Sequence, residues 1–212
     1  MSQYLTLPLN RAIVSAGYKS AAYRKVFGWP HCGADLVDAG ADRRVLACGA
    51  GRVEACGPDA PALTGPGSRL GNVIVVVYPG VVLADGTTAD LTCRMYHLES
   101  IRCRAGDTLA RGDLLGEYGS TGAHTTGRHL HIEFDTDTRW PALAPGIRAG
   151  GRVINRTDQV RQAGGVRDST LAPARVLRRG PGQSLNTYAQ QLAQGWVSPG
   201  DLDAAALPAG AG

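Results

Sequence analysis

The sequence predicts a mainly β protein with an antiparallel sheet and a short C-terminal segment that contains one helix. The first observation is a series of short apolar and β-branched runs, several of which alternate with polar residues. The second is that clusters of Gly, Pro and Asp separate these runs, as turns do. The third is composition, because 29 of the 212 residues are Gly and only 2 are Phe. Together these features favour short strands joined by tight turns over long helices.

The expected elements follow an entry segment of about 28 residues that has an apolar patch at Ala12–Val14. Turn signals lie between the runs, including Pro79-Gly80 inside an apolar run and Asp85-Gly86 after it. Such spacing is typical of an antiparallel sheet in a domain that ends near residue 140. The strands are expected around residues 36–37, 45–47, 52–54, 73–78, 91–96, 114–115 and 129–134.

A change of amino-acid composition after Trp140 marks the end of this domain, since Pro, Gly and Ala dominate the next residues. We therefore divide the chain into a main domain, residues 1–145, and a C-terminal extension, residues 146–212. The extension contains one expected helix, Ser184–Gln194, which Ser184 would cap and Gly195 would end. It either packs on the main domain or forms a small module of its own.

Charge and hydropathy exclude some functions. The formal net charge is +4 and the sequence pI is about 8.9, without a run of Lys and Arg. This balance argues against nucleic-acid binding and suits an anionic polymer such as a cell wall. No stretch has the roughly 18 apolar residues of a membrane span, and the N-terminus lacks the apolar core of a signal peptide. We therefore expect a phage or a non-classical route to carry the protein out of the cell.

The cysteines are odd in number and lack the C-x-x-C spacing of a structural zinc ribbon. The favoured interpretation is small buried thiols. The alternative is a disulfide formed after export, joining Cys48 to Cys56 or Cys93 to Cys103. Cys32 lies next to a histidine, but strand alternation would turn its side chain away from a metal. The five are Cys32, Cys48, Cys56, Cys93 and Cys103.

The five histidines carry the chemistry, because all lie between His31 and His131. In a strand, His129 and His131 share one face, while Leu130 faces the other side. His31 and Asp35 add an imidazole and a carboxylate. Two histidines and one carboxylate hold zinc with one position open for water or substrate, which is the catalytic pattern. The remaining histidines suit proton transfer near neutral pH.

Three segments resemble the lysostaphin-type zinc endopeptidases, which cleave peptide bridges or stem peptides of bacterial peptidoglycan. HCGADLV is similar to the H-x-G-x-D opening of that family. MYHLESIRCRAGDTLARGDLLGEYGSTG resembles its Y-x-H-L segment, its Gly-Asp turns and its G-x-T-G. TTGRHLHIEF is similar to its T-G-x-H-L-H-x-E segment. The resemblance covers roughly residues 10–140 and implies a β-rich domain with a narrow groove along its central sheet.

This resemblance implies a role for each matching position. The zinc ligands would be His31, Asp35 and His131. His129 would be the general base, and His97 would polarise or stabilise the oxyanion. Substrate contacts would come from Asn72, which stands in a Gly-Asn pair, and from His124.

Three further residues lie next to these positions in the sequence. Met95 replaces the tyrosine of the Y-x-H-L pattern, and we expect Tyr96, one place later, to point into the core. Glu133 shares the face of His131 and could orient a ligand. The expected function is a zinc-dependent endopeptidase of bacterial peptidoglycan. The alternative is a non-catalytic, zinc-containing wall-binding or regulatory module of the same fold.

Overall fold

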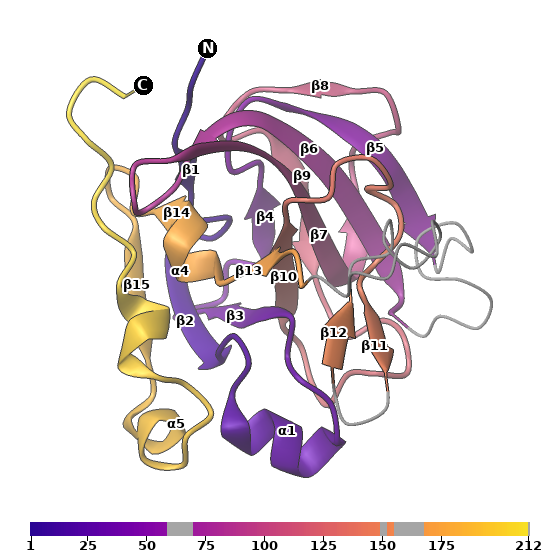
Figure 1. Cartoon of the computed structure of the whole chain (residues 1–212), viewed down its shortest axis with the longest axis vertical. Coiled ribbons are helices and arrows are strands. Elements are labelled where there is room, and N and C mark those ends of the chain that lie inside the picture. Colours follow the sequence, from indigo (N-terminus) through magenta and orange to yellow (C-terminus); the bar gives the residue numbers. More distant parts are fainter. Residues whose placement is uncertain (59–69, 149–151, 155–167, 212) are drawn as a thin grey trace.

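The computed structural model describes residues 1–58, 70–148, 152–154 and 168–211. Its main feature is a large, strongly curved sheet (Figure 1). The strands of its central path, in spatial order, are β15 (Ser184–Thr187), β2 (Arg11–Ala16), β3 (Gly33–Asp38), β10 (Leu130–Asp135), β7 (Thr88–Ile101), β6 (Asn72–Val82), β5 (Gly51–Pro58) and β8 (Thr108–Leu109).

Short elements complete the sheet and its surroundings. β13 (Thr170–Leu171) pairs with β10, while β9 (Leu114–Tyr118) joins β4 (Arg44–Leu46) to β7. Two small separate sheets are formed by β1 (Leu5–Thr6) with β14 (Leu177–Arg178), and by β11 (Gly146–Arg148) with β12 (Arg152–Ile154). The helices are α1 (Ala21–Phe27), α4 (Pro173–Val176), α5 (Ala189–Ala193) and the 3-10 turn η2 (Pro199–Leu202).

The mainly β class is confirmed, and every strand expected before residue 140 is present. The expected turn at Pro79-Gly80 is wrong, because β6 continues through these residues as a bulge. Gly80 adopts a φ of 62°, and its N–H donates to Asp90 Oδ1 at 2.8 Å. The bulge is compatible with proline because it interrupts the ladder where proline has no N–H to donate.

The secondary structure of the C-terminal extension differs from the one predicted from the sequence. Residues Ser184–Thr187 form strand β15, which pairs in parallel with β2, and only Ala189–Ala193 is helical. The edge of β2 offers unpaired backbone groups, and satisfying them outweighs the weak helix propensity of Asn186 and Thr187. Together with the parallel β1–β14 pair, this makes the strand pairing mixed instead of purely antiparallel.

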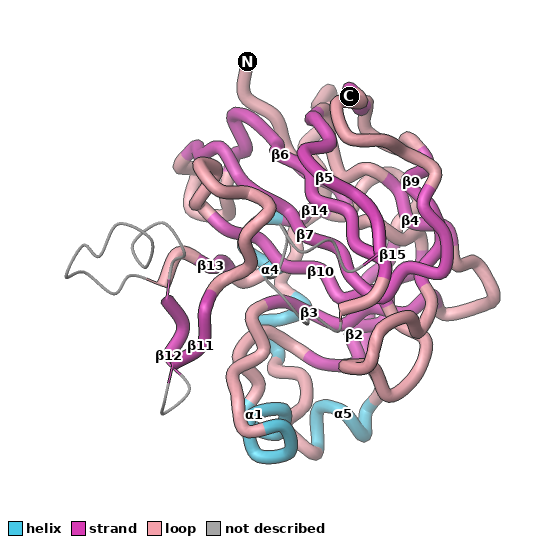
Figure 2. Tube along the Cα trace, turned by 90° about the vertical axis from the view of Figure 1, so that its right-hand side faces the viewer, coloured by secondary structure: helices cyan, strands magenta, loops and turns pink. Residues whose placement is uncertain are grey.

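Helix α1 was not expected from the sequence. Ser20 caps its start, because the Ser20 Oγ accepts a hydrogen bond from Tyr23 N at 3.3 Å. Gly28 ends it with a φ of 82°, the left-handed conformation common after helices. In both ribbon views α1 and α5 lie side by side at the same end of the molecule (Figures 1 and 2).

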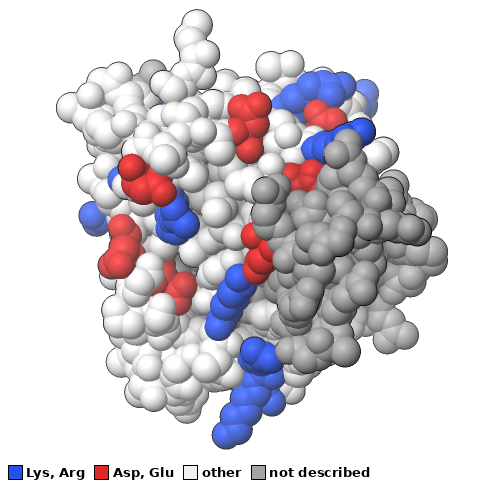
Figure 3. Space-filling model, viewed as in Figure 1, with Lys and Arg blue, Asp and Glu red and all other residues white. Residues whose placement is uncertain are grey.

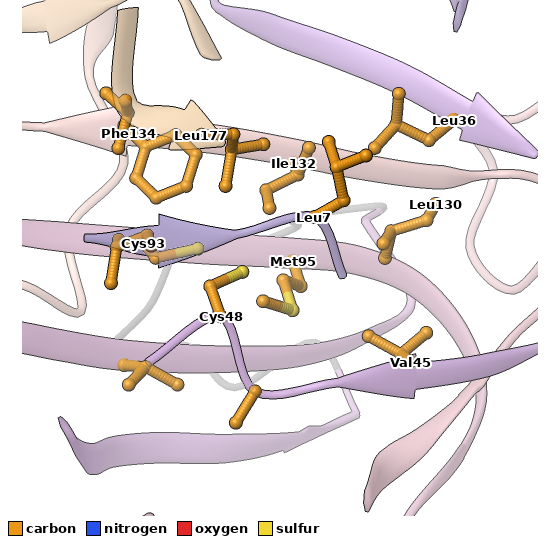
Figure 4. Close-up of a cluster of buried hydrophobic side chains, with 14 of the residues drawn as sticks. Leu7, Leu36, Val45, Cys48, Cys93, Met95, Leu130, Ile132, Phe134 and Leu177 are labelled. Atoms are coloured by element: carbon orange, nitrogen blue, oxygen red, sulfur yellow. The ribbon is translucent and has the colours of Figure 1, made fainter. Parts of the chain in front are cut away.

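The core lies on one face of the central strands. Leu130, Ile132 and Phe134 point into it from β10 and are essentially unexposed. The N-terminal segment crosses this face and places Leu7 over Met95 (Figure 4). The opposite face of β10 carries the polar residues of the site, so one strand separates the core from the chemistry.

The five cysteines are free thiols in the structure; four are buried, as the favoured interpretation predicted, and Cys56 is half-buried. Burial raises the pKa of Cys48 to about 12. Cys48 and Cys93 lie near each other within the core (Figure 4). Cys56 is close to Cys103, because its Sγ donates to the Cys103 carbonyl at 3.4 Å.

The described surface in Figure 3 carries scattered charges of both signs, without a large patch of one sign. Within the described residues, none of the helices is long and apolar enough to cross a membrane.

The core face of β10 gives a direct test of stability. Ile132 is fully buried, so Ile132→Ala should lower the free energy of unfolding by about 2–5 kcal/mol through lost burial and a cavity. Leu114→Ala, at a 40% exposed position on β9, is the matched control and should cost at most about 0.5 kcal/mol. Urea denaturation in EDTA measures both without a metal contribution. Equal costs for the two variants would contradict this placement of the core.

Candidate metal centre

The centre is assembled by strand pairing. In the β3–β10 pair, His131 lies directly opposite Asp35, and in the β10–β7 pair it lies opposite Tyr96. His31 precedes β3 by two residues, and its ring reaches the same face of the sheet. Residues that are about 100 positions apart in sequence therefore meet at one point.

Three ligand atoms converge there. His31 Nε2 lies 3.0 Å from Asp35 Oδ1 and 3.0 Å from His131 Nδ1, and the last two atoms are 2.9 Å apart. A tetrahedral zinc ion with bonds of about 2.0–2.1 Å holds its ligands about 3.3 Å apart. The triangle is thus close to the size that zinc requires, and two nitrogens with one carboxylate oxygen are a typical zinc donor set.

The second nitrogen of each ligand imidazole has its own partner. His31 Nδ1 lies 2.9 Å from the Gly17 carbonyl, and His131 Nε2 lies 3.6 Å from Glu133 Oε2. Such partners fix the tautomer and leave the other nitrogen free to bind metal. The expectation that Glu133 orients a ligand agrees with this geometry.

Glu133 is itself held by a buried network. Tyr96 donates its hydroxyl to Glu133 Oε1 at 2.8 Å, and Arg94 Nη1 donates to the same atom at 3.1 Å. Arg94 also donates to Asp135 and to the carbonyls of residues 141 and 143. Its side chain is only 1% exposed, so these four partners replace the water that the guanidinium has lost.

In the metal-free centre, the Asp35 carboxylate is ionised and the His131 imidazole beside it is protonated. Burial alone lowers the pKa of His131, but its hydrogen bonds to Asp35 and Glu133 outweigh burial and raise it to about 9. Burial favours the neutral form of Asp35, yet the charge on His31 and hydrogen bonds from both imidazoles hold the Asp35 pKa well below its usual range. A cation that binds here must displace the His131 proton.

His97 and His129 lie beside this triangle. Their ring centroids are 4.8 Å apart, and His129 Nε2 lies 3.6 Å from Asp35 Oδ1. The Nδ1 atoms face backbone carbonyls, that of Thr121 at 3.0 Å for His97 and that of Gly127 at 2.8 Å for His129. These nitrogens are therefore the donors, and a neutral ring in this orientation has its lone pair on Nε2.

Burial, together with the charges on His131 and His129, lowers the pKa of His97 to about 4. His97 is therefore neutral near pH 7. Because its Nδ1 donates to Thr121, the neutral ring can only accept a hydrogen bond at Nε2. A role in stabilising an oxyanion requires a proton on that atom.

Tyr96 corrects one expectation. Strand alternation predicted that it would face away from His97, into the core, yet both residues line the same cavity. The reason is the φ of 65° at His97, which breaks the alternation of β7. The Tyr96 ring stacks on His131, with centroids 5.2 Å apart and planes at 18°.

The remaining predicted residues are placed as follows. His124 lines the cavity above the triangle, and its ring meets Trp29 edge-on with centroids 6.1 Å apart. Asn72 is not among the described lining residues, and its amide donates to the Leu98 carbonyl at 2.8 Å. Cys32 is buried near the centre, but its thiol donates to the Pro30 carbonyl and is not part of the ligand group.

A cavity of about 970 Å³ lies over the triangle. Its lining also includes residues that sequence reasoning missed, from α1 and from the C-terminal extension. The residues after 189 reach the centre through the pairing of β15 with β2, which no local pattern marks, whereas those at 23–29 lie in and just after the unexpected helix α1. These residues are Tyr23, Phe27, Trp29, Gln190, Gln191, Gln194 and Trp196.

The region that contains this centre matches a known protein family. Residues 30–142 match Peptidase family M23. The chain belongs to this family. The matched segment contains His31, Asp35, His97, His129 and His131, and a likeness to lysostaphin-type enzymes was expected from the same residues.

Solved structures of similar fold include M23 and lysostaphin proteins. A zinc-containing peptidase from Vibrio cholerae is 25% identical, with a TM-score of 0.45, over 63% of this chain and 36% of that one. The chain thus spans about a third of that protein. The lysostaphin catalytic domain from Staphylococcus simulans is 22% identical, with a TM-score of 0.41, over 65% and 80% of the two chains. A prophage-encoded M23 catalytic domain from Enterococcus faecalis is 18% identical, with a TM-score of 0.45, over 74% and 95%. None of the curated proteins matches this sequence.

The triangle predicts binding of one zinc ion per chain. Asp35→Asn and His131→Ala each remove a ligand, so we expect the zinc affinity to fall by about 100-fold or more. His124→Ala, the histidine outside the centre, is the matched control and should keep its zinc. Elemental analysis after dialysis against a weak chelator measures the retained metal. Equal zinc in all variants would contradict the ligand assignment.

Zinc binding should also release a proton. His131 is protonated in the metal-free protein below its pKa of about 9, so zinc affinity should rise with pH, by about tenfold per unit, and level off above pH 9. Calorimetric titrations at pH 7.5 in buffers of different ionisation enthalpy count the protons released. A count of zero, with affinity independent of pH, would show that His131 does not bind the ion through Nδ1.

Proposed function

We propose that this protein is a zinc-dependent endopeptidase that cleaves peptide cross-bridges or stem peptides of bacterial peptidoglycan. The observation that carries the proposal is the convergence of three ligand atoms with two further imidazoles. His129 Nε2 lies 3.6 Å from Asp35 Oδ1, while its Nδ1 is occupied by the Gly127 carbonyl. Membership of the M23 peptidase family supports the reaction class.

In this proposal His31, Asp35 and His131 hold the zinc. Bound zinc supplies a Lewis acid that polarises the scissile carbonyl and lowers the pKa of water to roughly 7. His129 accepts a proton from the attacking water at Nε2 and returns it to the leaving amine. Gly127 fixes the tautomer that makes this possible, since its carbonyl accepts the Nδ1 proton at 2.8 Å.

His97 takes the second role. His97 lines the same cavity, and the Thr121 carbonyl holds its ring in place. When Nε2 is protonated, His97 donates to the oxyanion of the tetrahedral intermediate. The His97 ring lies beside that of His129, with centroids 4.8 Å apart.

The function can be tested by separating metal binding from turnover. His129→Ala should keep about one zinc per chain and lose about 10²–10⁴-fold in the rate of peptidoglycan cleavage, as expected when a general base is removed. Turbidity loss of purified walls from several bacteria measures the rate, and zinc analysis of the same samples is the control.

Two outcomes would contradict the proposal. If wild type binds zinc but cleaves no wall and no wall peptide, the non-catalytic wall-binding or regulatory module is the better description. If His129→Ala cleaves as fast as wild type, the base lies elsewhere.

A further inference from the structure

The turn at residues 17–20, between β2 and α1, connects the C-terminal extension to the candidate metal centre. We call it the β2–α1 turn. The turn and the extension (residues 146–212) both lie outside the segment that matches the M23 family, residues 30–142. Any support that they give to the centre is therefore additional to what the matched segment supplies.

On one side the turn holds His31, the proposed zinc ligand. The Gly17 carbonyl accepts a hydrogen bond from His31 Nδ1 at 2.9 Å, and Lys19 N donates to the His31 carbonyl at 2.8 Å. Helix α1, which follows the turn, stacks the Tyr23 ring on the imidazole, with centroids 4.2 Å apart and planes at 14°. Both the backbone and the ring of His31 are thus positioned from this turn and from the helix that it begins.

On the other side the backbone of the extension holds both ends of the turn. Gly17 N donates to the Trp196 carbonyl, and Ser20 Oγ donates to the Gly195 carbonyl, each at 2.8 Å. Gly17 therefore makes a direct connection, since its N–H binds the extension while its carbonyl binds His31. A displacement of the extension would move the atom that accepts the His31 Nδ1 proton.

Side chains of the extension hold the middle of the turn. Tyr18 N donates to Asp201 Oδ1 at 3.1 Å, and the Tyr18 hydroxyl lies 2.7 Å from Thr170 Oγ1. Lys19 forms an ion pair with Asp168. Lys19 also has a φ of 52°, an unfavourable conformation for a residue with a Cβ, which persists only where the surroundings hold it. The contacts with the extension supply that hold.

Asp201 is fitted closely to the turn. Its carboxylate fills the space beside Gly17, where a Cβ would lie 2.0 Å from Asp201 Oδ2. The same oxygen accepts hydrogen bonds from the N and Oγ atoms of Ser198, at 2.8 Å each. Asp201 is therefore a short side chain that is fixed at one oxygen by Ser198 and binds the turn with the other.

We propose that Asp201 is a positioning residue of the metal centre, which acts through the β2–α1 turn to hold His31 Nε2 in the ligand triangle. The extension is then a working part of the centre. Groups that orient a metal ligand contribute to metal affinity although they do not touch the metal. The inference rests on the ligand role of His31 in the proposed function, and zinc affinity tests it without any need for turnover.

The test is the zinc affinity of folded variants, measured by competition with a chromophoric chelator. Asp201→Ala removes the acceptor of Tyr18 N, and we expect the affinity to fall by about tenfold. Asp201→Asn keeps an oxygen that can accept this hydrogen bond, so its affinity should stay within about twofold of wild type.

Gln183→Ala is the matched control. Gln183 ties the extension to Leu7, because its Oε1 accepts from Leu7 N at 3.2 Å and its Nε2 donates to the Leu7 carbonyl at 2.9 Å. It does not line the cavity. Losing these bonds should lower the Tm and leave the zinc affinity of the folded protein unchanged, which separates positioning from stability.

Gly17→Ala tests the same contact from the other side, because the added methyl group would displace the Asp201 carboxylate. It should lower zinc affinity in wild type and have less than about a twofold further effect in Asp201→Ala, since the two changes act on one contact.

Three results would overturn the inference. Wild-type zinc affinity in Asp201→Ala and Gly17→Ala would leave the extension a structural role alone. An equal loss in Gln183→Ala would trace the effect to stability. Full affinity in His31→Ala would remove the ligand assignment and the inference with it. The predicted losses in a protein that cleaves no peptide would support the inference while the proposed peptidase function fails.

Discussion

The backbone register between β3 and β10 is the constraint on which the rest of the centre depends. It sets His131 directly opposite Asp35, and a slip of one residue would turn every side chain of β10 to the other face. Leu130, Ile132 and Phe134 prevent this slip, because the opposite face offers them no core. Apolar packing on one side of the strand thus fixes metal geometry on the other.

A buried charge network supports that geometry. Arg94 neutralises Glu133 and Asp135 on the site face of the sheet, and Glu133 in turn orients His131. Removing one member would leave a charge buried without its partner, which costs several kcal/mol, whereas the complete network adds little net stability. The network instead fixes the orientation of the His131 ring, which Glu133 holds at one nitrogen and Tyr96 holds by stacking.

The sequence was informative wherever a local pattern was enough. The alternation around His129 and His131 predicted a strand with both imidazoles on one face, and the structure has strand β10 there, paired with β3 and β7. Tyr96 was misplaced because the positive φ of His97 has no signature in residue type. The helix expected over Ser184–Gln194 was too long, because its first half pairs with β2 through a contact about 170 residues away in sequence. The role of Arg94 was not predicted for the same reason, since its partners on β10 and beyond lie about 40 residues away in sequence.

The central claim is that one zinc ion binds to His31, Asp35 and His131, and the most direct measurement is anomalous diffraction at the zinc edge from crystals of the zinc-loaded protein. We predict one strong peak within about 2.0–2.2 Å of His31 Nε2, Asp35 Oδ1 and His131 Nδ1. The Nε2 atoms of His97 and His129 should face it across the open position. A peak bound through His131 Nε2, or located away from these three residues, would contradict the account.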